Sequence, residues 1–353
     1  MNNIFLIVGA RPNFIKAAAI LVAAKKQNVV IDLIHTGQHY DATMSDIFFQ
    51  ELHIDPPLVN LGIATLATYG EFLYKCKTRF IELFSVYKPK IVIVVGDVIS
   101  SLAAALAANI TKTTLIHVEA GLRSFDYTMP EELNRILIDS VSDFFFVTEP
   151  AGVENLKKEG KEHNVYLVGN TMIDTLYANL AAINHRKYCR ELHLKEDEYV
   201  VMTIHRPSNV GSNLIDILKN INKIGCDLPI IFPVHPKIGS NLAHLNLKNV
   251  KLISPLGYFE FLSLVLDCKF VITDSGGLQE ETSALGIPCL TLRNNTERPI
   301  TIERGTNTLV GQDYPALLRA VNNIMANECV KLAELIWDGK AGSRIISTLR
   351  TIL

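Results

Sequence analysis

Short apolar runs rich in valine and isoleucine recur along the chain, and each is followed by a segment long enough to form a helix. The runs lack the polar alternation of strands with one solvated face, which is typical of parallel strands covered on both faces. Strand–helix alternation on this scale predicts a doubly wound α/β architecture. The predicted strands are 4–9, 29–37, 91–97, 114–121, 144–150, 165–170, 199–205, 229–235, 250–256, 269–277, 288–294 and 307–311.

These strands are too many for one comfortable sheet, and 353 residues are enough for two hydrophobic cores. We therefore predict two Rossmann-like domains, residues 1–169 and 170–338, with a hinge at Gly169-Asn170. The C-terminal segment, about 339–353, is predicted to be a helix that packs back on the first domain.

The composition is that of an ordinary globular enzyme, with 48% hydrophobic and 20% charged residues. A net charge of -2 provides no basic field, so nucleic acid is not an expected partner. The apolar run near the N-terminus is too short for a signal peptide, and no stretch reaches the roughly 18 apolar residues that a membrane span needs. The six cysteines show no CxxC spacing, which disfavours zinc sites and disulfides and predicts a cytoplasmic location.

The segment 274–299 carries the strongest functional signal. A predicted strand ends in the tetrapeptide Asp-Ser-Gly-Gly (274–277), and a helical pattern is predicted to begin at Leu278. Backbone N–H groups at such a turn, together with the positive end of the helix dipole, form an anion site suited to a diphosphate. Residues 279–281 would lie on the first helical turn, where a carboxylate can reach a ribose hydroxyl. Read alone, such a turn more often only caps a helix.

Polar signatures follow the other strands as well. In open α/β sheets the carboxyl edge of the strands is where ligands bind, so signatures gathered there support the diphosphate interpretation. Two such edges that face each other would form a cleft between the domains. The signatures are 9–12, 36–39, 96–98, 117–123, 203–209, 233–236, 274–277 and 293–299.

Motifs in one order along nearly the whole chain carry a resemblance to a known family. They are GARPNFIK (9–16), GQHYDATMSDIFF (37–49), GDV (96–98), HVEAGLRSFDYTMPEELNR (117–135), FVTEPAGVENL (146–156), GNTMID (169–174), TIHRPSNV (203–210), FPVHP (232–236), DSGGLQEE (274–281) and NNTERP (294–299). In these motifs the chain resembles the UDP-N-acetylglucosamine 2-epimerases, whose two-domain fold is glycosyltransferase-B-like. The resemblance implies a UDP-sugar substrate, a homodimer, no cofactor and no metal.

The resemblance implies a mechanism in which UDP leaves by anti elimination, giving a 2-acetamidoglucal, and then adds back with the proton delivered to the opposite face. It carries catalytic roles onto Asp97, Glu119, Glu131 and His205. The three carboxylates come from the first domain and the histidine from the second. Carboxylates crowded in a closed cleft would raise one another's pKa, which suits a general acid. Without the resemblance, Asp97 could cap the next helix and Glu131 could be a helix-dipole partner.

The resemblance also assigns contacts to UDP. Arg11 is carried over as a diphosphate ligand, because a guanidinium offers the two-pronged donor that phosphate prefers. Glu281 is the ribose contact, and Phe261 corresponds to the uracil side, with core packing as its alternative. The backbone nest is assigned to Ser275, Gly276 and Gly277. The cleft-lining residues are Lys16, Arg123, Arg206, His235 and Arg298, with a surface ion pair as the alternative for Lys16 and Arg123.

The chain departs from the family pattern at Ile99, where many relatives carry a polar residue, and in the segment 61–76. In non-hydrolysing bacterial relatives a second UDP-N-acetylglucosamine binds beside the substrate and activates the enzyme. Gln38 and His39 match part of that allosteric site, but the matching loop is apolar over 63–67. Lost polar contacts predict weak or absent activation.

The motifs leave five functions open. The first is a non-hydrolysing epimerase that interconverts UDP-N-acetylglucosamine and UDP-N-acetylmannosamine for surface polysaccharide synthesis, which the forms of residues 9–16 and 129–135 favour. The second is a hydrolysing epimerase that releases N-acetylmannosamine. The third is a 2-epimerase of a related UDP-diacetamido sugar, since such relatives share most of the motifs. A glycosyltransferase on the same fold or an inactive nucleotide-sugar sensor is less favoured.

Overall fold

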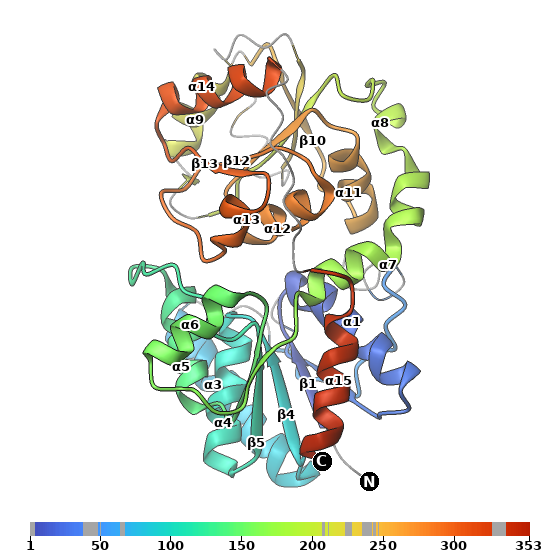
Figure 1. The fold of residues 1–353 in the computed structure, drawn as a ribbon, viewed down its shortest axis with the longest axis vertical. Helices are drawn as coiled ribbons and strands as arrows, with labels where there is room; N and C mark the ends of the chain where they lie inside the picture. Colours follow the sequence, from blue (N-terminus) through green and yellow to red (C-terminus); the bar gives the residue numbers. More distant parts are fainter. Residues whose placement is uncertain are drawn as a thin grey trace. The chain divides into compact units, whose positions relative to one another are not determined.

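The computed structural model describes residues 4–37, 49, 51–63, 68–206, 209–210, 212–222, 228–234, 242, 245, 247–326 and 337–353. The chain divides into two compact units, one of Met1–Ala178 with Ile336–Leu353 and one of Asn179–Leu335. Each unit contains one parallel sheet with helices packed on it (Figure 1), so the predicted fold class is confirmed. No helix in the described part of the chain is both long and apolar enough to cross a membrane.

The first unit has a seven-stranded sheet in the order β3-β2-β1-β4-β5-β6-β7. Every residue of β1 and β4 is buried, as expected for central parallel strands covered on both faces. The pattern analysis does not predict β3, because two residues are too few to show a periodicity. The strands are β1 (Ile4–Val8), β2 (Asp32–His35), β3 (Val59–Asn60), β4 (Ile91–Val95), β5 (Thr114–Val118), β6 (Phe144–Val147) and β7 (Val165–Leu167).

The helices of the first unit follow its strands. Helix α3 buries Phe72, Cys76, Phe80 and Phe84, which recur every four residues and form one apolar stripe. This stripe belongs to the same hydrophobic core as the alanine-rich α4. The helices are α1 (Arg11–Lys26), α3 (Tyr69–Tyr87), α4 (Ile99–Thr111), α5 (Pro130–Val141), α6 (Pro150–Lys158), the beginning of α7 (Thr171–Arg186) and α15 (Ala341–Ile352).

The second unit has a six-stranded parallel sheet in the order β10-β9-β8-β11-β12-β13. Its strands are β8 (Val200–Thr203), β9 (Ile230–Pro233), β10 (Val250–Ile253), β11 (Phe270–Thr273), β12 (Cys289–Thr291) and β13 (Asn307–Leu309). Its helices are the end of α7, α8 (Tyr188–Glu191), α9 (Ser212–Ile221), α11 (Tyr258–Leu266), α12 (Gly276–Leu285), α13 (Ile300–Glu303) and α14 (Tyr314–Met325). The strands predicted from the sequence are longer than the observed ones, because the prediction included the polar residues that follow each strand.

The C-terminal helix α15 packs against α1 in the first unit (Figure 1). The N–H of Gly342, in the first turn of α15, donates to Asp174 Oδ2 at 2.8 Å. The indole of Trp337 donates to the carbonyl oxygen of Thr148 at 3.1 Å. The boundary between the units falls inside α7, after Ala178, whereas the sequence prediction places it at Gly169-Asn170.

A buried ion network joins β5, α5 and the segment after α6. Asp139 is fully buried, and its two oxygens lie 2.6 Å from His117 Nδ1 and 2.7 Å from Arg123 Nη2. Arg123 also donates to both carboxylate oxygens of Glu159, each at 2.8 Å. His117 Nε2 lies 3.2 Å from the carbonyl oxygen of Gly96, directly before Asp97. The network therefore holds together the loops that follow β4 and β5.

Replacing Gly342 with alanine tests the packing of α15. The new Cβ would lie 2.5 Å from the carbonyl oxygen of Ala19 in α1. Alanine normally favours a helix over glycine by up to about 1 kcal/mol. The close contact predicts the opposite sign, a loss of about 1–3 kcal/mol in the free energy of unfolding. Urea unfolding measures the change, and S347A, exposed on the same helix, is the control. A G342A protein as stable as wild type would contradict this close packing.

The ion network predicts how stability depends on pH. Burial by itself raises the pKa of Asp139, but the adjacent His117 and Arg123 outweigh it and lower the pKa below its usual value. Because the folded pKa is the lower one, this carboxylate stabilises the fold above about pH 4, and the contribution is lost as pH falls through the folded pKa.

D139N should therefore be less stable than wild type at neutral pH, and its stability should fall less steeply between about pH 4 and pH 2. Denaturant unfolding at a series of pH values measures both effects. E154Q, an exposed carboxylate on α6, is the control and should follow the wild-type curve. Parallel curves for D139N and wild type would contradict the assignment.

Candidate functional site

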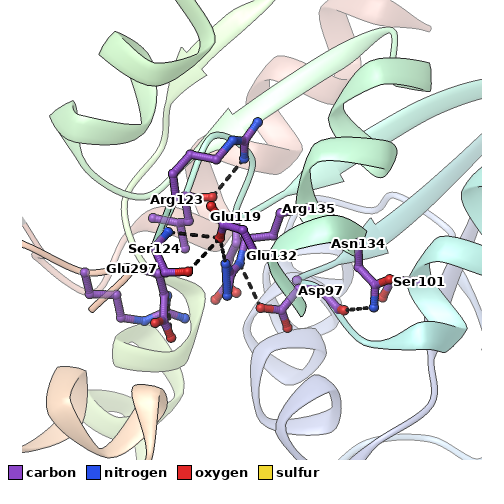
Figure 2. Close-up of polar contacts among 12 residues, drawn as sticks. Asp97, Ser101, Glu119, Arg123, Ser124, Glu132, Asn134, Arg135 and Glu297 are labelled. Carbon is purple, nitrogen blue, oxygen red and sulfur yellow. Dashed lines mark hydrogen bonds and ion pairs between the residues drawn. The ribbon is translucent and has the colours of Figure 1, made fainter. Parts of the chain in front are cut away.

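Asp97 follows β4 and is held by two residues of α5. Arg135 Nε donates to Asp97 Oδ2 at 2.9 Å, and Asn134 Nδ2 donates to the Asp97 carbonyl oxygen at 2.8 Å (Figure 2). Helix α4 begins after Val98, its N-cap, which makes no side-chain cap hydrogen bond. The Asp97 side chain is 29% exposed, which leaves the carboxylate accessible while its position is determined by α5.

Glu119 follows β5 and is paired with Lys16 of α1. Glu119 Oε2 lies 2.5 Å from Lys16 Nζ, and both side chains are buried. Glu119 has a φ of 72°, a left-handed conformation that costs a non-glycine residue free energy and is concentrated at functional sites. Gly96 provides room for the pair, because a Cβ built on it would lie 3.2 Å from Glu119 Oε2. Lys16 is thus in a buried ion pair, unlike the surface pair considered as its alternative.

Two adjacent glutamates at the start of α5 have different environments. Glu131 is exposed, whereas Glu132 is buried. Glu132 accepts hydrogen bonds from the N–H groups of Ser124 and Phe125, each at 2.9 Å, and forms an ion pair with Arg135. Burial raises the pKa of Glu132, but these bonds outweigh it and keep the pKa below its usual value. The sequence analysis assigned no role to Glu132, although it lies inside the motif 117–135.

Arg135 links the two carboxylates, since it bonds to Asp97 through Nε and to Glu132 through Nη1. Asp97 is thus paired with Arg135, and Glu119 is paired with Lys16. These cations fix the positions of the two carboxylates.

In the second unit, His205 and Asp274 are brought together by strand register. Thr203 of β8 pairs with Thr273 of β11, so the residues just beyond both strands lie side by side. His205 Nδ1 lies 3.1 Å from Asp274 Oδ1, and the His205 ring is 60% exposed. A carboxylate at Nδ1 favours the tautomer whose Nε2 can accept a proton from a ligand.

Asp274 also organises the loop after β8. Its side chain is fully buried and accepts hydrogen bonds from the N–H of His205, the N–H of Arg206 and the amide of Asn209 at 3.1, 2.9 and 3.0 Å. Arg206 Nε donates to the Asp274 carbonyl oxygen at 3.0 Å. The sequence analysis quoted Asp274 as part of a motif without a role. The only local sign of a role in the sequence was that Asp274 directly follows an apolar strand.

The N-terminus of α12 has the composition of an anion site. The helix begins at Gly276 and not at Leu278 as predicted, because Ser275 is the N-cap and its Oγ accepts the N–H of Leu278. Gly276 and Gly277 therefore lie in the first turn, whose N–H groups have no acceptor earlier in the helix. Residues 280–281 lie beyond that turn, which corrects their predicted position.

The other predicted contacts of the second unit are buried or partly buried. Glu281 accepts a hydrogen bond from the hydroxyl of Tyr258 at 2.9 Å. Arg298 Nε lies 2.7 Å from Glu280 Oε1, and Arg206 Nη2 lies 3.8 Å from Glu297 Oε1. Phe261 lies on α11 and is partly buried against the hydrophobic core, which agrees with its core-packing alternative. The ligand roles of these residues stay predictions.

Some predicted residues cannot be placed. Gln38, His39 and His235 lie outside the described residues, as does the apolar part of the loop 63–67 beyond Ile63. Arg11 is the first residue of α1, and its side chain is not described. The allosteric assignment therefore stays a prediction.

Among the described residues, Cys189, Glu196 and Asp267 form one group with the spacing of metal ligands. Lys187 Nζ lies 3.2 Å from Glu196 and 2.9 Å from Asp267, and Arg190 Nη2 lies 3.7 Å from Glu196, so both carboxylates are already paired with cations. Burial raises the pKa of the Cys189 thiol, which disfavours the thiolate that a metal needs. This group therefore has the features of an ion-pair cluster.

Comparisons with known proteins identify the family of the chain. A family model described as UDP-N-acetylglucosamine 2-epimerase matches residues 22–350. The UDP-N-acetylglucosamine 2-epimerase of Methanocaldococcus jannaschii is 40% identical over 360 residues, which cover 98% of each chain. The UDP-2,3-diacetamido-2,3-dideoxy-D-glucuronate 2-epimerase of Pseudomonas aeruginosa is 36% identical and covers 98% of this chain and 99% of its own.

A crystal structure of the M. jannaschii enzyme in complex with UDP-GlcNAc and UDP is similar along 99% of both chains, with a TM-score of 0.91 and 39% identity. The two parallel α/β units of the present chain have the glycosyltransferase-B-like fold expected from the motifs. Sequence and structure are thus similar over almost the full length, and the chain belongs to the UDP-N-acetylglucosamine 2-epimerase family and is an isomerase of that family.

Proposed function

We propose that the protein interconverts UDP-N-acetylglucosamine and UDP-N-acetylmannosamine by elimination and re-addition of UDP, without hydrolysis. The observation that carries this proposal lies in the second unit: the His205–Asp274 pair directly precedes the first turn of α12. A group that can exchange a proton is therefore adjacent to backbone N–H groups suited to a departing diphosphate.

In this mechanism UDP is a leaving group that must be stabilised as its charge develops. The first turn of α12 supplies N–H groups and the positive end of a helix dipole. His205 supplies Nε2, with Nδ1 held by Asp274. The same contacts retain UDP while the glycal intermediate is present, so that UDP, and not water, adds back.

The carboxylates of the first unit are proposed to transfer the proton at the second carbon of the sugar. Removal from one face and delivery to the other require a base and an acid in different positions. Asp97 and Glu119 follow neighbouring strands β4 and β5, and Glu131 begins α5, so three positions are available. Arg135 and Lys16 hold the first two in place through ion pairs.

A related UDP-diacetamido sugar is the second candidate substrate. The relative from P. aeruginosa named for such a sugar is 36% identical over nearly the full chain, little less than the 40% of the M. jannaschii relative. We also propose a role in surface polysaccharide precursor synthesis, a cytoplasmic location and a homodimer. The buried free thiols of Cys76, Cys189, Cys268 and Cys289 suit a reducing compartment.

Incubation with UDP-N-acetylglucosamine in deuterated water, followed by NMR, tests the function. A new UDP-sugar with deuterium at the second carbon supports the non-hydrolysing epimerase. Free N-acetylmannosamine with UDP identifies the hydrolysing reaction. An unchanged sugar would contradict both, and the same assay with the UDP-diacetamido sugar would then test the second candidate.

The two adjacent glutamates of α5 allow a matched pair of variants. E131Q should lower turnover by about 100- to 10,000-fold, the range for a general acid or base, and should leave stability unchanged because Glu131 is exposed. E132Q should instead lower stability by about 1–3 kcal/mol, because Glu132 is buried and accepts several hydrogen bonds. Turnover assays and urea unfolding of both proteins measure this. An E131Q enzyme with the wild-type rate would favour the helix-dipole alternative for Glu131.

The His205–Asp274 pair predicts graded losses of activity. H205A should lower turnover by about 100- to 10,000-fold, because it removes the proposed proton-exchanging group. H205Q should rescue little of that loss, since an amide can donate a hydrogen bond but cannot exchange a proton. D274N should cost about 10- to 100-fold and alter the pH profile of turnover, because His205 loses the carboxylate that orients it. Wild-type turnover in H205A would remove His205 from the mechanism.

A further inference from the structure

Arg293 is the first residue of the signature 293–299, in which only Arg298 is assigned a role from the sequence. Arg293 follows β12, and Thr291 of β12 pairs in register with Thr273 of β11. Two residues beyond these partners lie Arg293 and Ser275, the N-cap of α12. Because parallel neighbours end at one edge, the sheet brings the Arg293 guanidinium to the N-terminus of α12.

The Arg293 guanidinium is buried and only partly satisfied. The residue is 7% exposed, and its Nη2 lies 2.7 Å from Glu297 Oε2 and 3.2 Å from Asn295 Oδ1. Its Nη1 is buried and has no hydrogen-bond partner in the described part of the structure. A buried donor left without an acceptor costs free energy, so a ligand that accepts from Nη1 would bind favourably.

The position of Nη1 relates it to the anion site. A Cβ built on Gly276 would lie 4.0 Å from Arg293 Nη1 and would collide with Glu297 Oε1. The unpartnered nitrogen therefore lies beside the first turn of α12, where the N–H groups of Gly276 and Gly277 have no acceptor earlier in the helix. Two independent sets of donors, one from the backbone and one from a buried side chain, are present at the same place.

Guanidinium and carboxylate groups surround this place. Three guanidinium groups, those of Arg206, Arg293 and Arg298, lie within 4.0 Å of Glu297. Glu280 pairs with Arg298. With Asp274, three carboxylates are present beside the three guanidinium groups, so it is the unpartnered Nη1 of Arg293, and not a net positive charge, that favours an anion here. The Asp274 carboxylate is directed to the N–H groups of the loop after β8.

We propose that Arg293 Nη1 is a ligand of the diphosphate of the UDP-sugar, held in place by its ion pair with Glu297. This inference rests on the proposed function, because it adds a side-chain donor to the diphosphate site at α12. The guanidinium serves two acceptors at once, Glu297 through Nη2 and the diphosphate through Nη1. A lysine has a single ammonium and cannot match that geometry.

Calorimetric titration of the full-length protein with UDP and with uridine tests the proposal. R293Q should bind UDP about 10- to 100-fold more weakly than wild type and bind uridine with unchanged affinity, because uridine has no phosphate. R293K keeps the positive charge and should show an intermediate loss for UDP. R319Q, which removes an exposed arginine on α14, is the control and should bind both ligands as wild type does.

E297Q separates direct binding from a structural role. It removes the partner of Nη2 and keeps the Nη1 donor, so it should retain more UDP affinity than R293Q. Wild-type UDP affinity in R293Q and R293K, equal losses for UDP and uridine, or a loss in E297Q as large as in R293Q would each overturn the proposal. Failure of the wild-type protein to bind UDP would instead overturn the proposed function.

Discussion

The hydrogen bonds accepted by the buried carboxylate of Asp274 hold the candidate site of the second unit together. It accepts hydrogen bonds from the N–H groups of His205 and Arg206 and lies within hydrogen-bonding distance of the His205 ring. It also precedes Ser275, the N-cap of α12. One side chain therefore fixes the loop after β8, orients an imidazole and adjoins the helix N-terminus proposed to hold the diphosphate. A carboxylate without these donors would be costly to bury, so site geometry and stability are coupled here.

The first unit uses cations for the same purpose. Arg135 of α5 and Lys16 of α1 hold Asp97 and Glu119 at the ends of neighbouring strands. Arg135 is in turn paired with Glu132, whose other partners are backbone N–H groups of the loop before α5. The proposed catalytic carboxylates are thus positioned by buried charges that touch no reacting atom. Variants of these supporting residues should change both turnover and stability, whereas variants of exposed Glu131 should change turnover alone.

Strand–helix alternation was sufficient to predict the fold class, and the order of the motifs was sufficient to predict the family. Both signals are local sequence patterns, which can be recognised without knowing how the chain folds. The strand after residue 58 was missed, since β3 has only two residues. The start of α12 was placed two residues late, because glycine has a low intrinsic helix propensity and the Ser275 cap outweighs it.

The residue types at the strand ends, and hence the chemistry available to the protein, can be read directly from the sequence. Which of these residues meet depends on how the chain folds. His205 and Asp274 are 69 residues apart in the chain and become neighbours through the register of β8 with β11. Glu131 and Glu132 are adjacent in sequence, but the helix turns one to solvent and the other into the interior. Hydrogen bonds and burial depend on distances in space, which cannot be read from separation along the sequence. For this reason the roles of Arg293, Glu132 and Asp274 become visible only in the folded chain.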